Sequence, residues 1–71
     1  MESILIFRTS INGKRDVKRV KSVLEQCPQI SKWNVDLEDW EKVLRIECKG
    51  ITPTGILDML HSIDIQAAEL E

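Results

Sequence analysis

The chain has 71 residues, of which 42% are hydrophobic and 31% charged, a balance typical of a folded domain and not of a disordered segment. The formal net charge of -2 argues against a general nucleic-acid-binding protein, since such proteins are usually basic. No apolar run approaches the roughly 20 residues of a membrane span, and the early Glu2 is unlike a signal peptide, so residues 1–71 are expected to form one cytoplasmic domain.

Residues 3–8 predict a first strand, because they are rich in β-branched and aromatic side chains. Ile4 and Ile6 would point to one side of this strand, and Leu5 and Phe7 to the other. Apolar side chains on both sides are typical of a strand in the middle of a sheet.

Residues 9–17 join this strand to a first helix. Asn12 is expected to be the N-cap, and Gly13 allows a tight entry into the helix. Apolar residues then recur at helical spacing, at Val17, Val20, Leu24 and Cys27. The helix should therefore have about 13 residues and end before Pro28.

Two alternating segments follow. Residues 30–37 predict a strand whose core face carries Trp33, Val35 and Leu37. The pair Glu38-Asp39 is expected to form a turn. A third strand should then run from Trp40 to residue 48, with its inward positions at Leu44, Ile46 and Cys48.

The last third of the chain predicts a helix and a short strand. Thr52 is a good N-cap and Pro53 suits the first helical position. The apolar face of this helix consists of Ile56, Met59, Leu60 and Ile63. Asp64 interrupts the pattern, and residues 65–70 are expected to form a final strand at an edge of the sheet.

The order β-α-β-β-α-β predicts an α+β fold, a ferredoxin-like sandwich. Right-handed crossovers place both helices on one face of a four-stranded antiparallel sheet with strand order 4-1-3-2. Either Ile4 and Ile6 or Leu5 and Phe7 then lie on the open face, where they could serve a partner. The chain is expected to be a monomer or a weak homodimer. This fold hosts many unrelated activities and settles no function.

Three segments follow known sequence patterns. Residues 17–24 match V-x-x-V-E-x-A-L, residues 27–37 match L-P-G-V-x-x-V-x-V-D-L, and residues 63–67 correspond to A-G-Y-x-A. The second match departs from its pattern at Cys27, Gln29 and Trp33. Over nearly its whole length the chain therefore resembles the heavy-metal-associated domain of copper chaperones and metal-pumping ATPases.

That family binds metal through the motif M-x-C-x-x-C in its first loop. By the resemblance, the Met position falls on Ile11 and the two thiol positions fall on Gly13 and Asp16. Neither Gly13 nor Asp16 can supply the soft sulfur ligand that Cu(I) and Zn(II) prefer. The resemblance therefore implies the scaffold without its thiolate site, and no metal or other cofactor is expected.

Cys27, Cys48 and His61 are the remaining candidates for metal ligands. The two cysteines could approach each other at the pole opposite the first loop, but they are expected to be free buried thiols that act as small hydrophobic residues. His61 could neighbour Asp16, yet a zinc site needs at least three protein ligands. A metal carrier with these atypical ligands stays the alternative hypothesis.

The start of the first helix is strongly basic. Its cations oppose the helix dipole and are balanced locally by Asp16 alone; they are Lys14, Arg15, Lys18, Arg19 and Lys21. An acidic turn is expected at the same pole, with Asp36, Glu38, Asp39 and Glu41. Since domains of the resembled family dock by charge beside the loop, the first four cations are candidates for binding a protein partner. The other hypothesis is a solvated helix face.

The composition also bears on catalysis. With one histidine, no tyrosine and no glycine-rich phosphate loop, no nucleophile–base–acid set can be assembled, so an enzyme is not expected. The sequence predicts a small cytoplasmic module for protein interaction or regulation. The alternative is a metal-transport protein with atypical ligands, and a small-ligand sensor has no residue-level support.

Overall fold

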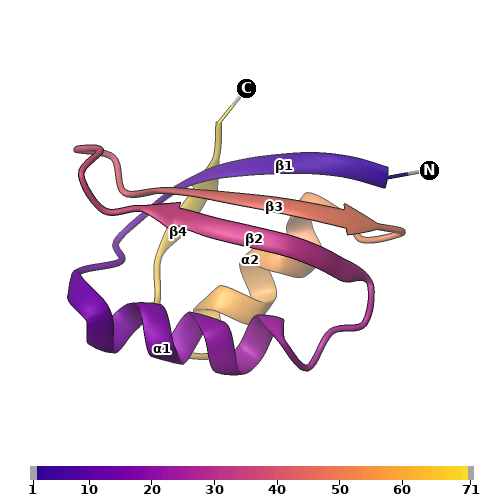
Figure 1. The fold of residues 1–71 in the computed structure, drawn as a ribbon, viewed down its shortest axis with the longest axis horizontal. Coiled ribbons are helices and arrows are strands. Elements are labelled where there is room, and N and C mark those ends of the chain that lie inside the picture. The colour runs from indigo at the N-terminus through magenta and orange to yellow at the C-terminus, as the bar shows by residue number, and fades with distance from the viewer. Residues whose placement is uncertain (1, 71) are drawn as a thin grey trace.

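The computed structural model of the chain describes residues 2–70. Its elements are β1 (Glu2–Thr9), α1 (Gly13–Leu24), β2 (Ile30–Asp36), β3 (Val43–Lys49), α2 (Pro53–His61) and β4 (Ala67–Glu69). The strands form one antiparallel sheet in the order β2-β3-β1-β4, and both helices lie against one face of it (Figure 1). The predicted ferredoxin-like α+β fold is confirmed, since the strand order 4-1-3-2 is this order read in reverse.

The hydrophobic core lies between the sheet and the helices. Alternate residues of the central strands and one stripe of each helix meet there, because side chains repeat with period 2 along a strand and 3.6 along a helix. The buried residues of these elements are Phe7, Val20, Leu24, Leu44, Ile46, Cys48, Ile56 and Leu60. Burial of each large apolar side chain stabilises the fold by roughly 1.5–3 kcal/mol, which holds the two layers together.

β1 turns its isoleucines away from this core. Phe7 is buried and pairs with Leu44 of β3, whereas Ile4 lies opposite Glu47 and is 61% exposed. Ile6, two residues from Ile4, lies on the same side of the strand. The open face of the sheet therefore carries Ile4 and Ile6. Of the two pairs that the sequence left open, Leu5 and Phe7 are the pair on the helix side.

Each helix begins at the predicted place. α1 begins at Gly13 directly after Asn12, and α2 begins at Pro53 directly after Thr52. The Thr52 side-chain oxygen accepts a hydrogen bond from the Gly55 N–H at 3.2 Å, so the predicted Thr cap is confirmed. Within residues 2–70, neither helix combines the length and the apolar character needed to cross a membrane.

The third strand starts later than the sequence predicts. β3 begins at Val43, and residues 37–42 form a loop that contains Trp40. Lys42 has a φ of 49°, which breaks the extended backbone just before the strand. The expectation that the third strand begins at Trp40 is therefore wrong.

The final strand is also shorter than predicted. β4 spans only Ala67–Glu69, the three residues that pair with Thr9, Arg8 and Phe7 of β1. Asp64, with a φ of 62°, ends the turn after α2. Ile65 lies before the strand but is buried in the core, with 2% of its surface exposed. Ile65, which was predicted to be the first residue of the edge strand, is thus a core residue that precedes the strand.

Candidate interaction surface

The backbone enters α1 at Gly13, which has a φ of +80°. L-residues with side chains rarely adopt this φ, so the turn requires glycine. Asn12 occupies the N-cap position, but its side chain makes no capping hydrogen bond. Its backbone N–H instead donates to Oδ2 of Asp16 at 2.8 Å. The helix start is therefore closed by a carboxylate from within α1 and not by the predicted Asn12 side-chain cap.

This geometry bears on the two positions that the resemblance assigns to metal thiolates. A side chain at Gly13 would meet open space, so the positive φ, and not crowding, disfavours a cysteine there. Asp16 holds the turn through its bond to Asn12 and also lies 3.6 Å from the Arg19 guanidinium. Both positions thus have structural roles in this chain.

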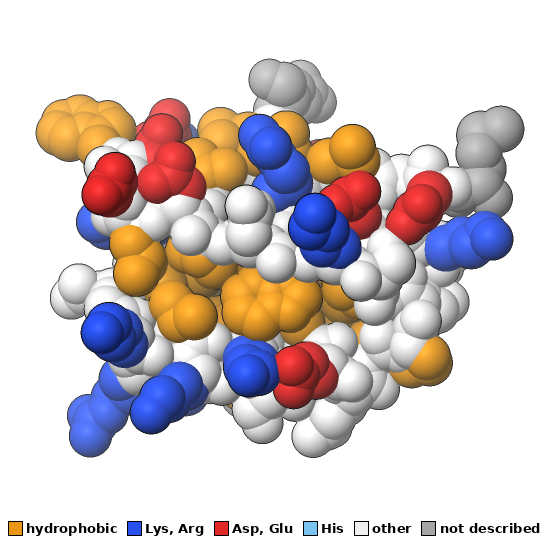
Figure 2. All heavy atoms as spheres, viewed as in Figure 1, with side chains coloured by type: hydrophobic (Ala, Val, Ile, Leu, Met, Phe, Trp, Pro, Cys, Tyr) orange, Lys and Arg blue, Asp and Glu red, His pale blue; other side chains and the backbone are white. Residues whose placement is uncertain are grey.

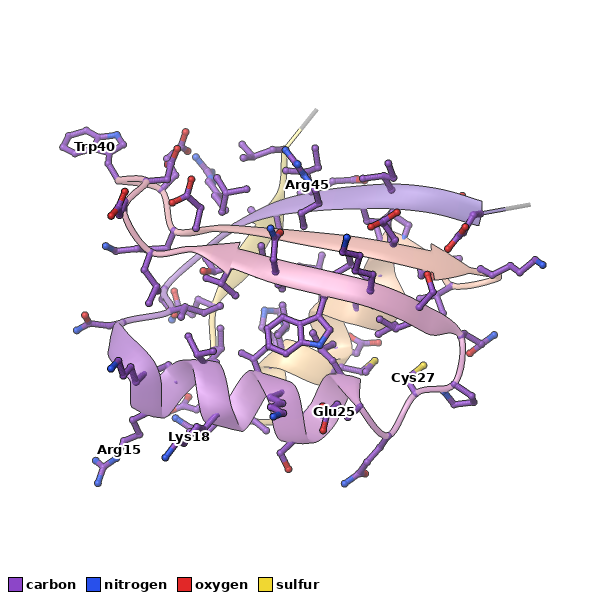
Figure 3. The ribbon with its side chains drawn as sticks, in the orientation of Figure 1. Arg15, Lys18, Glu25, Cys27, Trp40 and Arg45 are labelled. Carbon is purple, nitrogen blue, oxygen red and sulfur yellow. The ribbon has the colours of Figure 1, made fainter. Side chains whose placement is uncertain are left out.

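Four exposed cations line the first two turns of α1; this basic patch consists of Lys14, Arg15, Lys18 and Arg19. Arg19 is set apart from the other three by two contacts. It pairs with Asp16, and its Nη2 donates to the backbone carbonyl of Ile63, which ties α1 to the segment after α2. No ion pair joins the three remaining cations to any residue between 2 and 70. Figure 3 shows Arg15 and Lys18 pointing away from the sheet into solvent.

The segment that joins β2 to β3 carries the opposite charge. What we call the acidic loop comprises Asp36, the last residue of β2, and the loop 37–42; its acids are Asp36, Glu38, Asp39 and Glu41. Asp36 Oδ1 accepts hydrogen bonds from the backbone N–H groups of Glu38 and Asp39, at 3.1 and 3.2 Å. Asp39 Oδ1 accepts from the Glu41 N–H at 2.7 Å, and its carbonyl accepts from the Lys42 N–H at 3.0 Å. Two of the four acids therefore shape the loop that displays them.

The acidic loop is fastened to the end of β1. The Thr9 N–H donates to the Glu41 carbonyl at 3.0 Å, and the Thr9 hydroxyl donates to the Lys42 carbonyl at 2.6 Å. Lys42 Nζ in turn donates to the Leu37 carbonyl at 2.7 Å. The two Thr9 bonds join the loop to the end of β1, next to the segment that leads into α1, and the Lys42 bond crosses the loop itself.

Trp40 stands at the tip of the acidic loop and is 93% exposed. An almost fully exposed tryptophan is unusual, because large aromatic side chains contribute most when buried in a core or an interface. The alternation in the sequence did not predict Trp40 as a surface residue. The same alternation would also have placed Lys42 on the core face, and that buried charge was the signal against extending the strand back to residue 40.

Opposite charges therefore lie side by side at one pole of the molecule. In Figure 2, Lys and Arg side chains gather over the start of α1 at the lower left, and Asp and Glu side chains gather over the acidic loop at the upper left. Hydrophobic side chains lie at the surface between the two groups. This pole offers a partner a cationic side, an anionic side and one exposed aromatic ring.

The two cysteines lie away from this pole. Cys48 is fully buried on β3, while Cys27 is half-buried in the turn after α1, so the prediction of a buried thiol holds for Cys48 only. Burial raises the pKa of the Cys48 thiol, and the nearby groups of Cys27 and Glu2 raise it further. Cys48 is therefore protonated at neutral pH, a state in which a thiol is neither a nucleophile nor a good metal ligand.

His61 is the last residue of α2 and is exposed. It lines a shallow hollow together with Asp64 and Gln66. The suggested neighbour Asp16 instead bonds to Asn12 and Arg19. Between residues 2 and 70, no group of three or more His, Cys, Asp or Glu side chains is arranged to hold a metal ion.

Comparison with known proteins adds no family assignment: neither protein-family models nor curated proteins match this chain.

Proposed function

We propose that this chain is a heavy-metal-associated-like domain that lacks the thiolate site and binds a partner protein through the basic patch. The observation that carries the proposal is the state of Lys14, Arg15 and Lys18. They are exposed and have no ion-pair partner within residues 2–70. Two of them lie in the first turn of α1, where cations oppose the helix dipole. Local stability does not account for this placement, whereas attraction of an acidic partner does.

The proposed partner is a protein with an acidic surface and not a nucleic acid. The acidic loop lies at the same pole, and the net charge of the chain is -2, so a polyanion would meet repulsion beside the basic patch. A folded partner can instead place its own acidic residues against α1 and its basic residues against the loop. Trp40 then supplies an aromatic contact at the tip of the acidic loop.

A cytoplasmic location belongs to this proposal. Cys27 and Cys48 are both free, which suits a reducing compartment. The alternative function, metal transport with Cys27, Cys48 or His61 as ligands, has weaker support. The Cys48 thiol is buried with a raised pKa, and His61 lies at the end of a different element, beside Asp64.

Affinity capture with a charge-reversed variant tests the proposal. The variant changes Lys14, Arg15 and Lys18 to Glu, and its matched control changes Arg8, Arg45 and Lys49, three exposed cations outside α1, to Glu. Partners held by the basic patch should be lost with the first variant and kept with the control. Their capture by the parent should also weaken as salt rises, because exposed charges are screened over about 10 Å at 0.1 M. Equal capture by parent and first variant at every salt concentration would refute the proposal.

A further inference from the structure

β2 lies at one edge of the sheet, and no other strand of residues 2–70 pairs with its outer side. An edge strand presents a row of backbone N–H and C=O groups with which another strand can pair. β4, at the other edge, has 3 residues, whereas β2 has 7. β2 is therefore the edge with the length to accept a further strand. Figure 1 shows it running along the near side of the sheet, above α1.

The regular part of β2 is shorter than the strand. β2 pairs with β3 in unbroken register from Lys32 to Asp36, and the register shifts between Ile30 and Lys32. Such an irregularity bends the strand and ends regular pairing. A further strand can thus follow the segment from Lys32 to Asp36, which has Asn34 at its midpoint.

We infer that a second copy of this chain pairs with β2 in antiparallel orientation about a twofold axis at Asn34, so that two sheets join into one. This register forms the pairs Lys32–Asp36, Trp33–Val35 and Asn34–Asn34 between the copies. Because the interface is isologous, the first two pairs each occur twice. Every residue from Lys32 to Asp36 has a partner in the second copy.

The charges of β2 fit this arrangement. Lys32 and Asp36 are exposed and lie, with Asn34, on the side of β2 that faces away from the helices. Neither forms an ion pair within residues 2–70, although Lys32 lies opposite Glu47 of β3. Asp36 uses Oδ1 for its two turn bonds, so Oδ2 can accept from Lys32 of the second copy. A lysine on an edge strand disfavours pairing with most other strands. In this register, however, Lys32 lies opposite Asp36 of the second copy, and the opposite charges favour the pairing.

The apolar residues of β2 fit the same register. Trp33 and Val35 pack against the core from the helix side but stay half-exposed, as does Leu37 beyond the strand. Figure 2 shows hydrophobic side chains at the surface between β2 and α1. In the paired strands Trp33 of one copy lies beside Val35 of the other. Aromatic and β-branched residues are a favourable cross-strand pair.

Neighbouring registers fit less well. A side chain keeps its face only when the register shifts by an even step, so the nearest alternatives centre on Trp33 or Val35. Centring on Trp33 places Asp36 opposite Ile30, within the irregular part of the strand. Centring on Val35 pairs Lys32 with Glu38, which lies in the loop and not in β2. The twofold axis at Asn34 alone keeps every pair inside the regular strand.

The contact is small, and small interfaces give weak, transient association. We expect a dissociation constant between about 10 μM and 1 mM. The paired strands are those of β2 and the basic patch lies on α1, so each dimer would present two basic patches to a partner and gain affinity by avidity. The inference does not rest on the proposed function, and it is tested without a partner protein.

Sedimentation equilibrium at protein concentrations from about 10 μM to 1 mM tests the pairing. Lys32→Glu and Asp36→Lys should each weaken association about tenfold or more, because each places like charges opposite one another across the twofold axis. The double variant Lys32→Glu/Asp36→Lys restores the opposite charges and should regain dimerisation. The double variant is best compared with Asp36→Lys alone, since both variants lose the two turn hydrogen bonds that the Asp36 carboxylate accepts. Arg8→Glu, an exposed position on β1, is the control and should leave association unchanged.

A cross-link tests the register itself. In a Cys27→Ser background, Asn34→Cys should form a disulfide-linked dimer in oxidised glutathione, because the two Cβ atoms lie about 4.5–5.5 Å apart in the paired strands. Lys32→Cys is the matched control, since its two copies would be separated by about 13 Å along the strands. A parent chain that stays monomeric at about 1 mM, a double variant no better than the single variants, or equal cross-linking at both positions would overturn the inference.

Discussion

The two helices of this domain begin in opposite ways. α2 starts with the side-chain cap of Thr52 and with Pro53, and neither an acid nor a base lies in its first turn. α1 starts without a side-chain cap, turns through Gly13 at positive φ, and carries cations where the dipole favours anions. The start of α2 follows the local rules of helix stability. The start of α1 breaks two of them, because its N-cap side chain makes no hydrogen bond and its first turn carries cations. Departures of this kind concentrate at functional sites, and this one coincides with the basic patch.

The bodies of the two helices should not share this difference. Leu24 of α1 and Leu60 of α2 are both buried in the core, with 1% and 0% of their surface exposed. Leu24→Ala and Leu60→Ala should each lower the free energy of unfolding by about 2–5 kcal/mol, since each leaves a cavity. Urea denaturation measures the loss. A loss below about 1 kcal/mol for Leu24→Ala would mean that α1 as a whole, and not only its start, is poorly anchored.

Glycine at the two helix starts should respond in opposite directions. Gly13→Ala should destabilise the protein by about 1–2 kcal/mol, because alanine is strained at a φ of +80°. A Cβ at Gly55 would make ordinary contacts of 3.6 Å with Ile51 and Thr52, so Gly55→Ala should stabilise by about 0.4–1 kcal/mol. Thermal unfolding of the two variants gives the signs. Equal shifts would show that the entry to α1 is not strained.

The two caps should differ as well. Thr52→Ala removes a capping hydrogen bond and should lower the free energy of unfolding by about 1 kcal/mol. Asn12→Ala removes a side chain that caps nothing and should change it by less than about 0.3 kcal/mol. Chemical denaturation resolves this difference. Similar losses for the two variants would mean that the Asn12 side chain does cap α1 in solution, and that the two helix starts do not differ in this respect.

The smallest predicted effect concerns charge. Lys14→Glu and Arg15→Glu should each raise the free energy of unfolding by about 0.3–1 kcal/mol at low salt, because a carboxylate suits the positive end of the dipole. The gain should shrink in about 1 M salt, where such interactions are screened. Gains that persist unchanged at high salt would assign the effect to helix propensity and not to the dipole.

Much of the fold follows from periodicity in the sequence. The alternation through Leu44, Ile46 and Cys48 predicted a core face that the structure confirms, and the helical spacing of Ile56 and Leu60 did the same for α2. These predictions succeed because burial of apolar side chains decides both the pattern and the structure.

The candidate surface was harder to predict. Trp40 fits the alternation of the third strand, yet the Asp36 and Asp39 carboxylates accept hydrogen bonds from backbone N–H groups, and residues 37–42 form a loop. Side-chain-to-backbone bonds of this kind compete with strand pairing and leave no periodic signal. The role of Arg19 was also hidden, because its bond to the Ile63 carbonyl joins segments that are distant in sequence. The sequence pointed to four equivalent cations, and the structure separates one of them.

The central claim is that the start of α1 is arranged for binding at the expense of local stability. The most direct measurement takes the variant with Lys14, Arg15 and Lys18 changed to Glu and determines its unfolding free energy and its capture of partners in parallel. We predict that the unfolding free energy stays equal or rises by a few tenths of a kcal/mol at low salt while salt-sensitive capture disappears. Capture equal to that of the parent, with the same sensitivity to salt, would contradict the claim and leave the basic patch a solvated helix face.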